Sequence, residues 1–133
     1  MAVAMMALLG SSCTHNGGDI GAWFGIWHLD QVSCDSASNL LDSTDYYFNF
    51  QDHIVSVRIE GPEHYQDETF GNWQESGDQL VITFPDPDRH WPPIPGFSAE
   101  CKFTFVQRSS KRMVLRLVAY DGHTYTYTLR KTV

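Results

Sequence analysis

Apolar and polar residues alternate along most of the chain from residue 25 onward, most clearly over residues 46–50 and 55–59. Successive side chains of a β-strand point to opposite faces, so this period of two predicts strands with one buried face. The pattern predicts about eight strands, centred on residues 25–33, 46–50, 54–59, 68–74, 80–84, 101–105, 115–117 and 125–130. It predicts no helix between them, so the chain is expected to be all-β.

Short polar turns join most of these predicted strands. Ser76-Gly77-Asp78 and Ser109-Ser110 are turn sequences, and Asp121-Gly122 is a strong signal for a two-residue hairpin. Successive hairpins favour an antiparallel, up-and-down arrangement, and closing it into a barrel leaves no open sheet edge. The expected fold is therefore an eight-stranded antiparallel up-and-down β-barrel. A two-sheet sandwich is the competing architecture.

Two connections are much longer than the rest, at residues 34–44 and 85–98. In an up-and-down barrel both follow an odd-numbered strand, so both belong to the same end, which we expect to be the open end. The barrel interior is predicted to contain large apolar side chains, namely Trp27, Leu29, Phe48, Phe50, Val57, Leu80, Ile82, Phe103, Phe105, Leu115, Leu117, Tyr125 and Tyr127. Eight strands enclose either side chains alone or one small ligand.

The second long connection contains five of the six prolines, which exclude a helix or a central strand there. Its apolar residues Trp91, Ile94 and Phe97 allow two interpretations: a lid or contact surface over the barrel mouth, or a plug folded into it. Asp86, Asp88 and His90 alternate in the same segment, but their spacing matches no established metal site. They are interpreted as solvated loop residues, and no metal site is predicted.

The N-terminal residues differ in composition from the rest of the chain. Residues 1–9 are uncharged and almost all apolar, and Gly10-Ser11-Ser12-Cys13 follows them. This arrangement resembles a bacterial lipoprotein signal, with residues 1–12 as the signal peptide and Cys13 as the lipidated residue. Residues 13–22 are rich in glycine and polar residues and are expected to be a flexible tether, so the barrel domain would span residues 23–133. The competing interpretation is an N-terminal helix packed on the domain.

Composition narrows the choice of partners. The 133 residues suit one domain, and the net charge of −7 without any basic cluster argues against nucleic acid as a partner.

A lipid anchor at Cys13 would place the protein in the bacterial cell envelope, attached to a membrane. In that oxidising compartment Cys34 and Cys101 could form a disulfide, because both are predicted to lie at the open end. Strict alternation places the two side chains on opposite faces of the sheet, so a bulge or an early strand end near Ser33 would be needed for the bond.

Three residues carry a resemblance to a known family. Gly25 and Trp27 open the first strand, and Arg130 lies near the end of the last one. This combination resembles the lipocalin (calycin) group, above all the short lipocalin-like lipoproteins of Gram-negative bacteria. The resemblance implies a barrel closed at one end by Trp27, with Arg130 packed across the indole. Such a cation–π contact contributes roughly 0.5–2 kcal/mol.

The expected function is binding rather than catalysis. The first hypothesis is a small apolar or amphipathic ligand at the open end of the barrel, bound by Leu29, Phe48, Trp91, Phe97, Phe103 and Tyr127. The alternative is a filled barrel that contacts a protein or glycan through loops 34–44 and 85–98. An enzyme ranks last, because the sequence shows no Gly-x-Ser-x-Gly, His-Glu-x-x-His or phosphate-binding motif. No catalytic residue and no cofactor is predicted.

Overall fold

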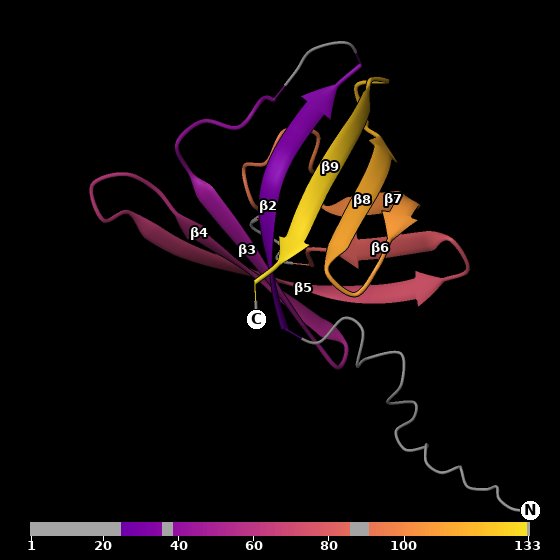
Figure 1. Ribbon diagram of the computed structural model, residues 1–133, viewed down its shortest axis with the longest axis horizontal. Helices are drawn as coiled ribbons and strands as arrows, with labels where there is room; N and C mark the ends of the chain where they lie inside the picture. The colour runs from indigo at the N-terminus through magenta and orange to yellow at the C-terminus, as the bar shows by residue number, and fades with distance from the viewer. Residues whose placement is uncertain (1–24, 36–38, 86–90, 133) are drawn as a thin grey trace, which may run out of the picture.

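The computed structural model describes residues 25–35, 39–85 and 91–132, which form a closed antiparallel barrel of eight strands in sequence order (Figure 1). The strands are β2 (Gly25–Cys34), β3 (Asp45–Gln51), β4 (Ile54–Glu60), β5 (Gln66–Ser76), β6 (Gln79–Thr83), β7 (Glu100–Arg108), β8 (Arg112–Val118) and β9 (Thr124–Lys131). Each strand pairs with its neighbours in sequence, and β9 pairs with β2 to close the barrel. The predicted fold is confirmed, and the sandwich is excluded.

Because the strands alternate in direction, the connections β2–β3, β4–β5, β6–β7 and β8–β9 all lie at one end, called the mouth here. The two long connections are therefore at the same end, as expected from strand parity. The opposite end has the tight turns and also the start of β2 and the end of β9 (Figure 1). In the described part of the chain, no helix is long and apolar enough to cross a bilayer.

The alternation of buried and exposed residues follows the sequence pattern closely. In β4, Val55, Val57 and Ile59 are buried, while Arg58 is exposed. Most of the predicted interior is buried, whereas Phe105 and Tyr125 are partly exposed and pack at its edge. The core also includes Val32 and Met113, which were not predicted to be interior.

A β-bulge in β2 changes which face its second half presents to the core. Leu29 pairs with Leu129 and Gln31 pairs with Thr128, so Asp30 is the extra residue. Trp27 and Leu29 are buried before the bulge, and Val32 is buried after it. The extra residue shifts the alternation by one position, and Cys34 therefore belongs to the inward-facing set.

Candidate functional site

The proline-rich connection between β6 and β7 folds into the mouth of the barrel. Ile94 and Phe97 are buried. The Phe97 ring lies 5.4 Å from the ring of Tyr127 and 5.6 Å from that of Phe103, and it also contacts Phe48 and Phe84. Of the two interpretations of this segment, the plug is the one that the structure adopts for Ile94 and Phe97.

Hydrogen bonds to backbone carbonyls fix the plug in place. The Tyr127 hydroxyl donates to the carbonyl of Pro95 at 2.6 Å, and the Tyr46 hydroxyl donates to that of Pro93 at 3.4 Å. Gly96 has φ of +87°, and a Cβ there would lie 2.4 Å from the Tyr127 hydroxyl. Only glycine fits this position, both in backbone conformation and in space.

The plug leaves almost no free volume inside the barrel. The central cavity measures about 10 Å³ and is lined by Leu29, Phe48, Phe50, Ile82, Phe97, Phe103, Leu115, Tyr127 and Leu129. A volume of this size admits about one water molecule. Leu29, Phe48, Phe97, Phe103 and Tyr127 were predicted as ligand-binding residues, and in the structure they pack in the core around this cavity. They fill the space that a ligand would need.

A larger cleft opens through the side of the barrel near the mouth. Strand β5 has 11 residues but β6 has only five, so pairing between them begins at Asn72 and Thr83. Residues 66–71 of β5 therefore have no β6 partner, and Pro85, Trp91 and Pro93 of the proline-rich connection lie beside them instead. The resulting cleft has a volume of about 470 Å³.

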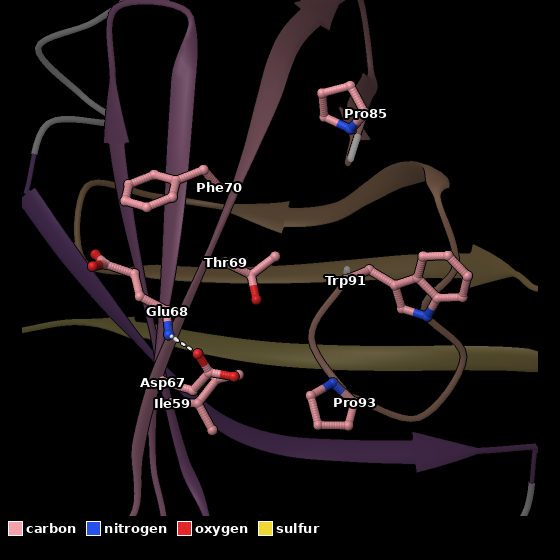
Figure 2. Close-up of a pocket in the computed structure, with 8 residues that line it drawn as sticks. All are labelled: Ile59, Asp67, Glu68, Thr69, Phe70, Pro85, Trp91 and Pro93. Carbon is pink, nitrogen blue, oxygen red and sulfur yellow. Dashed lines mark hydrogen bonds between the residues drawn. The ribbon is translucent and has the colours of Figure 1, made fainter. Parts of the chain in front are cut away.

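The two walls of the cleft differ in chemistry (Figure 2). One wall is formed by inward-facing residues of β4 and β5, namely Ile59, Asp67 and Thr69. The other is formed by Pro85, Trp91 and Pro93 of the connection, and Thr69 points across the cleft towards the Trp91 indole. Glu68 and Phe70 project from the outer face of β5 at the rim. Of the predicted ligand-binding residues, Trp91 alone lines this cleft.

Two acidic residues, Asp67 and Glu68, line the cleft on the β5 side. The Asp67 carboxylate accepts the backbone N–H of Glu68 at 2.8 Å. Thr69 is the one buried polar residue among those that the structure describes. The described residues of the lining include no Lys or Arg, so this part of the rim favours cationic or hydrogen-bond-donating groups.

Most residues of the cleft were not predicted from the sequence. A signal for it was present: the polar–apolar alternation after Gly77 ends early at a proline-rich segment, opposite a longer strand. Unequal lengths of neighbouring strands leave one edge unpaired. The missed residues are Ile59, Asp67, Glu68, Thr69, Phe70, Pro85 and Pro93.

Trp27 and Arg130 do not form the predicted contact. Trp27 is buried at the end opposite the mouth, as expected, and pairs with Lys131 in the register. Arg130 pairs with His28 on the outer face, and its guanidinium donates to Asp30 at 3.1 Å. Directly paired residues share a face, so Lys131 is the basic residue on the Trp27 side of the sheet. The predicted contact between Trp27 and Arg130 was therefore wrong by one position along β9.

The two described cysteines lie at the mouth but are not bonded to each other. Cys34 ends β2 and Cys101 is the second residue of β7, and both are free thiols. The disulfide allowed by the sequence is therefore absent, although the bulge needed to turn Cys34 inward is present. Burial raises the pKa of Cys101 to about 11, so this thiol stays protonated at neutral pH.

Several predictions fall on residues outside the described ranges. These are the signal peptide, the lipidated Cys13 and the tether, together with Asp86, Asp88 and His90. They stay predictions.

A closed eight-stranded up-and-down barrel with a tryptophan at its closed end defines a lipocalin-type protein. The chain belongs to the family of lipocalin-like domains, because the model of that family matches residues 5–131. A domain of this family typically binds other molecules rather than transforming them.

Solved structures share the fold. A lipocalin-like protein from Bacteroides uniformis superposes with a TM-score of 0.63 at 24% identity, over 84% of this chain and 100% of that one. An uncharacterized protein from Bacteroides eggerthii gives a TM-score of 0.63 at 19% identity, over 83% of this chain and 99% of that one. A comparison with curated proteins gives no match. At these identities the likeness supports the architecture alone.

Proposed function

We propose that this protein binds a small amphipathic ligand in the lateral cleft between β5 and the proline-rich connection. The observation that carries the proposal is the cleft of about 470 Å³, which contrasts with the 10 Å³ left in the barrel core. Binding sites for small molecules commonly have volumes of about 300–1,000 Å³. The proposal keeps the class of ligand expected from the sequence, a small apolar or amphipathic molecule. It moves the binding site from the open end of the barrel to the lateral cleft.

The lining suggests what kind of ligand fits. The Trp91 indole and the rings of Pro85 and Pro93 offer flat apolar surface on one wall. Asp67 on the other wall supplies a carboxylate, and Thr69 supplies a hydroxyl. A ligand with a flat apolar part and a primary amine would stack on the indole and donate to the carboxylate. The proposal includes no catalytic step and no cofactor.

Titration with a fluorescent probe tests this site. Dansylcadaverine has a naphthalene ring and a primary amine, and dansylamide has the ring without the amine. We expect dansylcadaverine to bind one molecule per chain and more tightly than dansylamide. Asp67→Asn should remove most of this preference, because the amine loses its charged acceptor. Trp91→Ala should weaken both probes, because it removes the stacking surface.

Matched controls separate the cleft from the rest of the surface. Asp78→Asn makes the same chemical change in the β5–β6 turn at the other end of the barrel. Tyr120→Ala removes an aromatic ring that is 83% exposed and is absent from the cleft lining. Both variants should bind the probes as the wild type does. Equal probe affinity in the wild type and in Trp91→Ala would rule out the cleft as the binding site.

The proposal includes export and a lipid anchor at Cys13. Strand β2 begins at the end opposite the mouth, so an anchor before it would direct the mouth and the cleft away from the membrane. In a bacterial host, the wild type should incorporate labelled fatty acid, and Cys13→Ala should not. The lipoprotein interpretation would be abandoned if the wild type incorporated none.

The filled core favours a second candidate, in which the mouth loops 34–44 and 85–98 contact a protein or glycan. The small core cavity supports it, because a barrel without an internal ligand is free to act as a rigid scaffold. Under this function neither probe would bind in the cleft. A partner isolated from envelope extracts would lose affinity when loop 85–98 is altered, as in Trp91→Ala.

A further inference from the structure

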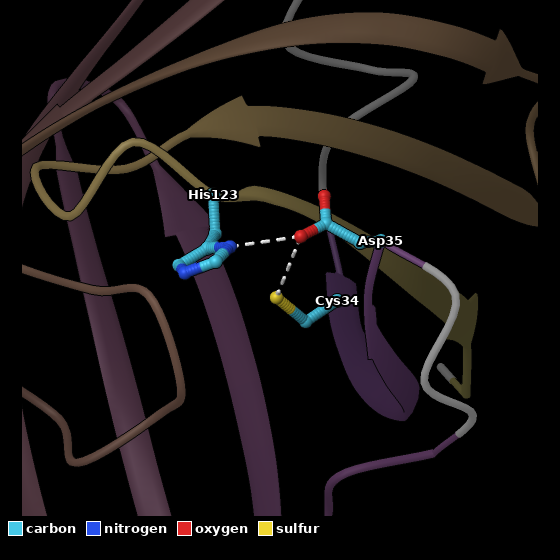
Figure 3. A group of neighbouring side chains, drawn as sticks. All are labelled: Cys34, Asp35 and His123. Carbon is cyan, nitrogen blue, oxygen red and sulfur yellow. Dashed lines mark hydrogen bonds and ion pairs between the residues drawn. The ribbon is translucent and has the colours of Figure 1, made fainter.

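Three potential metal ligands meet at the mouth, on the β2–β9 side of the barrel (Figure 3). Cys34 ends β2, Asp35 follows it, and His123 immediately precedes β9. The His123 Nδ1 lies 2.8 Å from an Asp35 carboxylate oxygen, and the Cys34 sulfur lies 3.8 Å from the same oxygen. One ligand atom from each residue lies within 4.8 Å of the other two.

Backbone pairing brings these residues together although 88 positions separate Asp35 from His123. The bulge at Asp30 places Cys34 opposite Tyr125 in the β2–β9 register. The Asp35 N–H donates to the carbonyl of Thr124 at 3.0 Å, and the Thr124 N–H donates back to the Asp35 carboxylate at 3.3 Å. The three side chains therefore start from two elements that are already tied to each other.

We propose that Cys34, Asp35 and His123 form a binding site for Zn²⁺ or a similar divalent transition cation. Thiolate, imidazole and carboxylate are the side-chain ligands that zinc uses, and three protein ligands leave a fourth position for water or an external donor. Around one tetrahedral zinc, ligand atoms lie about 3.3–3.7 Å apart, given bonds of about 2.0–2.3 Å. Small side-chain rotations would bring the three atoms to that spacing.

The surrounding charges fit a cation. The Asp121 carboxylate accepts hydrogen bonds from the backbone N–H of His123 and from the hydroxyl of Tyr125, each at 2.9 Å. A second carboxylate therefore adjoins the cluster. Desolvation and the Asp35 charge raise the pKa of Cys34, and the hydrogen bond from Asp35 raises that of His123. Zinc would displace the thiol proton, together with the imidazolium proton where His123 is protonated, and would take their place as the positive charge.

This site is separate from the lateral cleft, because no residue is common to the two. A bound ion would join the end of β2 to the adjacent β8–β9 turn at the rim of the mouth. A ligand that binds the folded state alone raises stability by RT ln(1 + L/Kd), where L is the free ligand concentration. Zinc should therefore raise the unfolding temperature of the protein.

Metal titration of the full chain tests the proposal. The protein carries Cys13→Ala, which removes the third thiol, and is reduced and treated with a chelator beforehand. We expect one Zn²⁺ per chain by calorimetry and an increase in unfolding temperature. Co²⁺ should give a thiolate-to-cobalt charge-transfer absorption. Asp35→Asn and His123→Gln should each weaken zinc binding at least about tenfold, and Cys34→Ser should also abolish the absorption band.

Two variants provide matched controls. Cys101→Ala removes the buried thiol, and His53→Gln removes an exposed imidazole from the β3–β4 turn at the opposite end. Both should keep one zinc site with unchanged affinity. The proposal is overturned if the protein takes up no zinc, which would make the cluster a hydrogen-bonded link only. Unchanged zinc affinity in folded Cys34→Ser or His123→Gln would overturn it as well.

Discussion

The hydroxyl of Tyr127 on β9 donates a hydrogen bond of 2.6 Å to the carbonyl of Pro95 in the proline-rich connection. This bond ties the centre of the plug to the barrel wall, and burial keeps the hydroxyl protonated by raising the pKa of Tyr127. The plug in turn places Trp91 beside the half of β5 that has no β6 partner. A partly buried hydrogen bond therefore links the filled core to the geometry of the lateral cleft.

Tyr127→Phe should remove this bond while keeping the ring. The Pro95 carbonyl would lose its partner, and an unsatisfied buried acceptor costs about 1–3 kcal/mol. We expect a loss of that size in the free energy of unfolding, measured with urea. Tyr120→Phe, at a residue 83% exposed, is the control and should change it by less than about 0.5 kcal/mol. Equal stability of the two variants would show that the bond contributes nothing.

Phe97→Ala should open the barrel interior. The ring packs against four other aromatic rings, and truncating a buried phenylalanine costs about 3–5 kcal/mol. The apolar cavity that remains should bind benzene, detected as an increase in unfolding temperature that the wild type does not show. Phe70→Ala, at a residue 59% exposed, should alter neither stability nor benzene binding. A variant with wild-type stability would mean that the plug does not pack as described.

Trp27→Ala should destabilise the fold by about 3–5 kcal/mol, because Trp27 is only 2% exposed. Arg130 should couple to Asp30 instead, since its guanidinium donates to that carboxylate through two nitrogens. A double-mutant cycle of Asp30→Ala and Arg130→Ala should give a coupling of about 0.5–1 kcal/mol. A larger coupling between Trp27 and Arg130 would restore the contact that the sequence suggested.

Asp30 should contribute to acid sensitivity. Its burial tends to raise the pKa, but hydrogen bonds from His28 and Arg130 outweigh burial and hold the pKa below the ordinary value of 3.8. A carboxyl whose pKa is lower in the folded state stabilises above its unfolded pKa, and this stabilisation disappears as the pH falls through the folded value.

Urea unfolding from neutral pH to about pH 3 measures this effect. The wild type should lose stability below about pH 4, and Asp30→Asn should lose less over the same range because it has no carboxyl to protonate. Asp78→Asn, in the β5–β6 turn, should follow the wild-type profile. An unchanged acid profile in Asp30→Asn would assign the loss to other carboxyl groups.

The barrel could be predicted from the sequence because the signals for strands and turns are local. Alternation of period two marks each strand, and Asp121-Gly122 marks the hairpin between β8 and β9. The order of short turns then leaves an up-and-down meander as the simplest topology, and it places both long connections at the mouth. The predicted alternation of inward and outward residues was wrong after Asp30, where β2 has a bulge. A bulge depends on how two distant strands pair and not on the residues around it.

The candidate sites depended on the tertiary structure. The sequence offered Trp91 and Phe97 as equivalent apolar residues of one loop, yet Phe97 fills the core and Trp91 lines the cleft. Their different roles follow from the shortness of β6, which leaves residues 66–71 of β5 without a β6 partner beside the loop. Cys34 and His123 likewise meet only because β9 returns to pair with β2. Local patterns determine the strands, but closure of the barrel decides which distant side chains become neighbours.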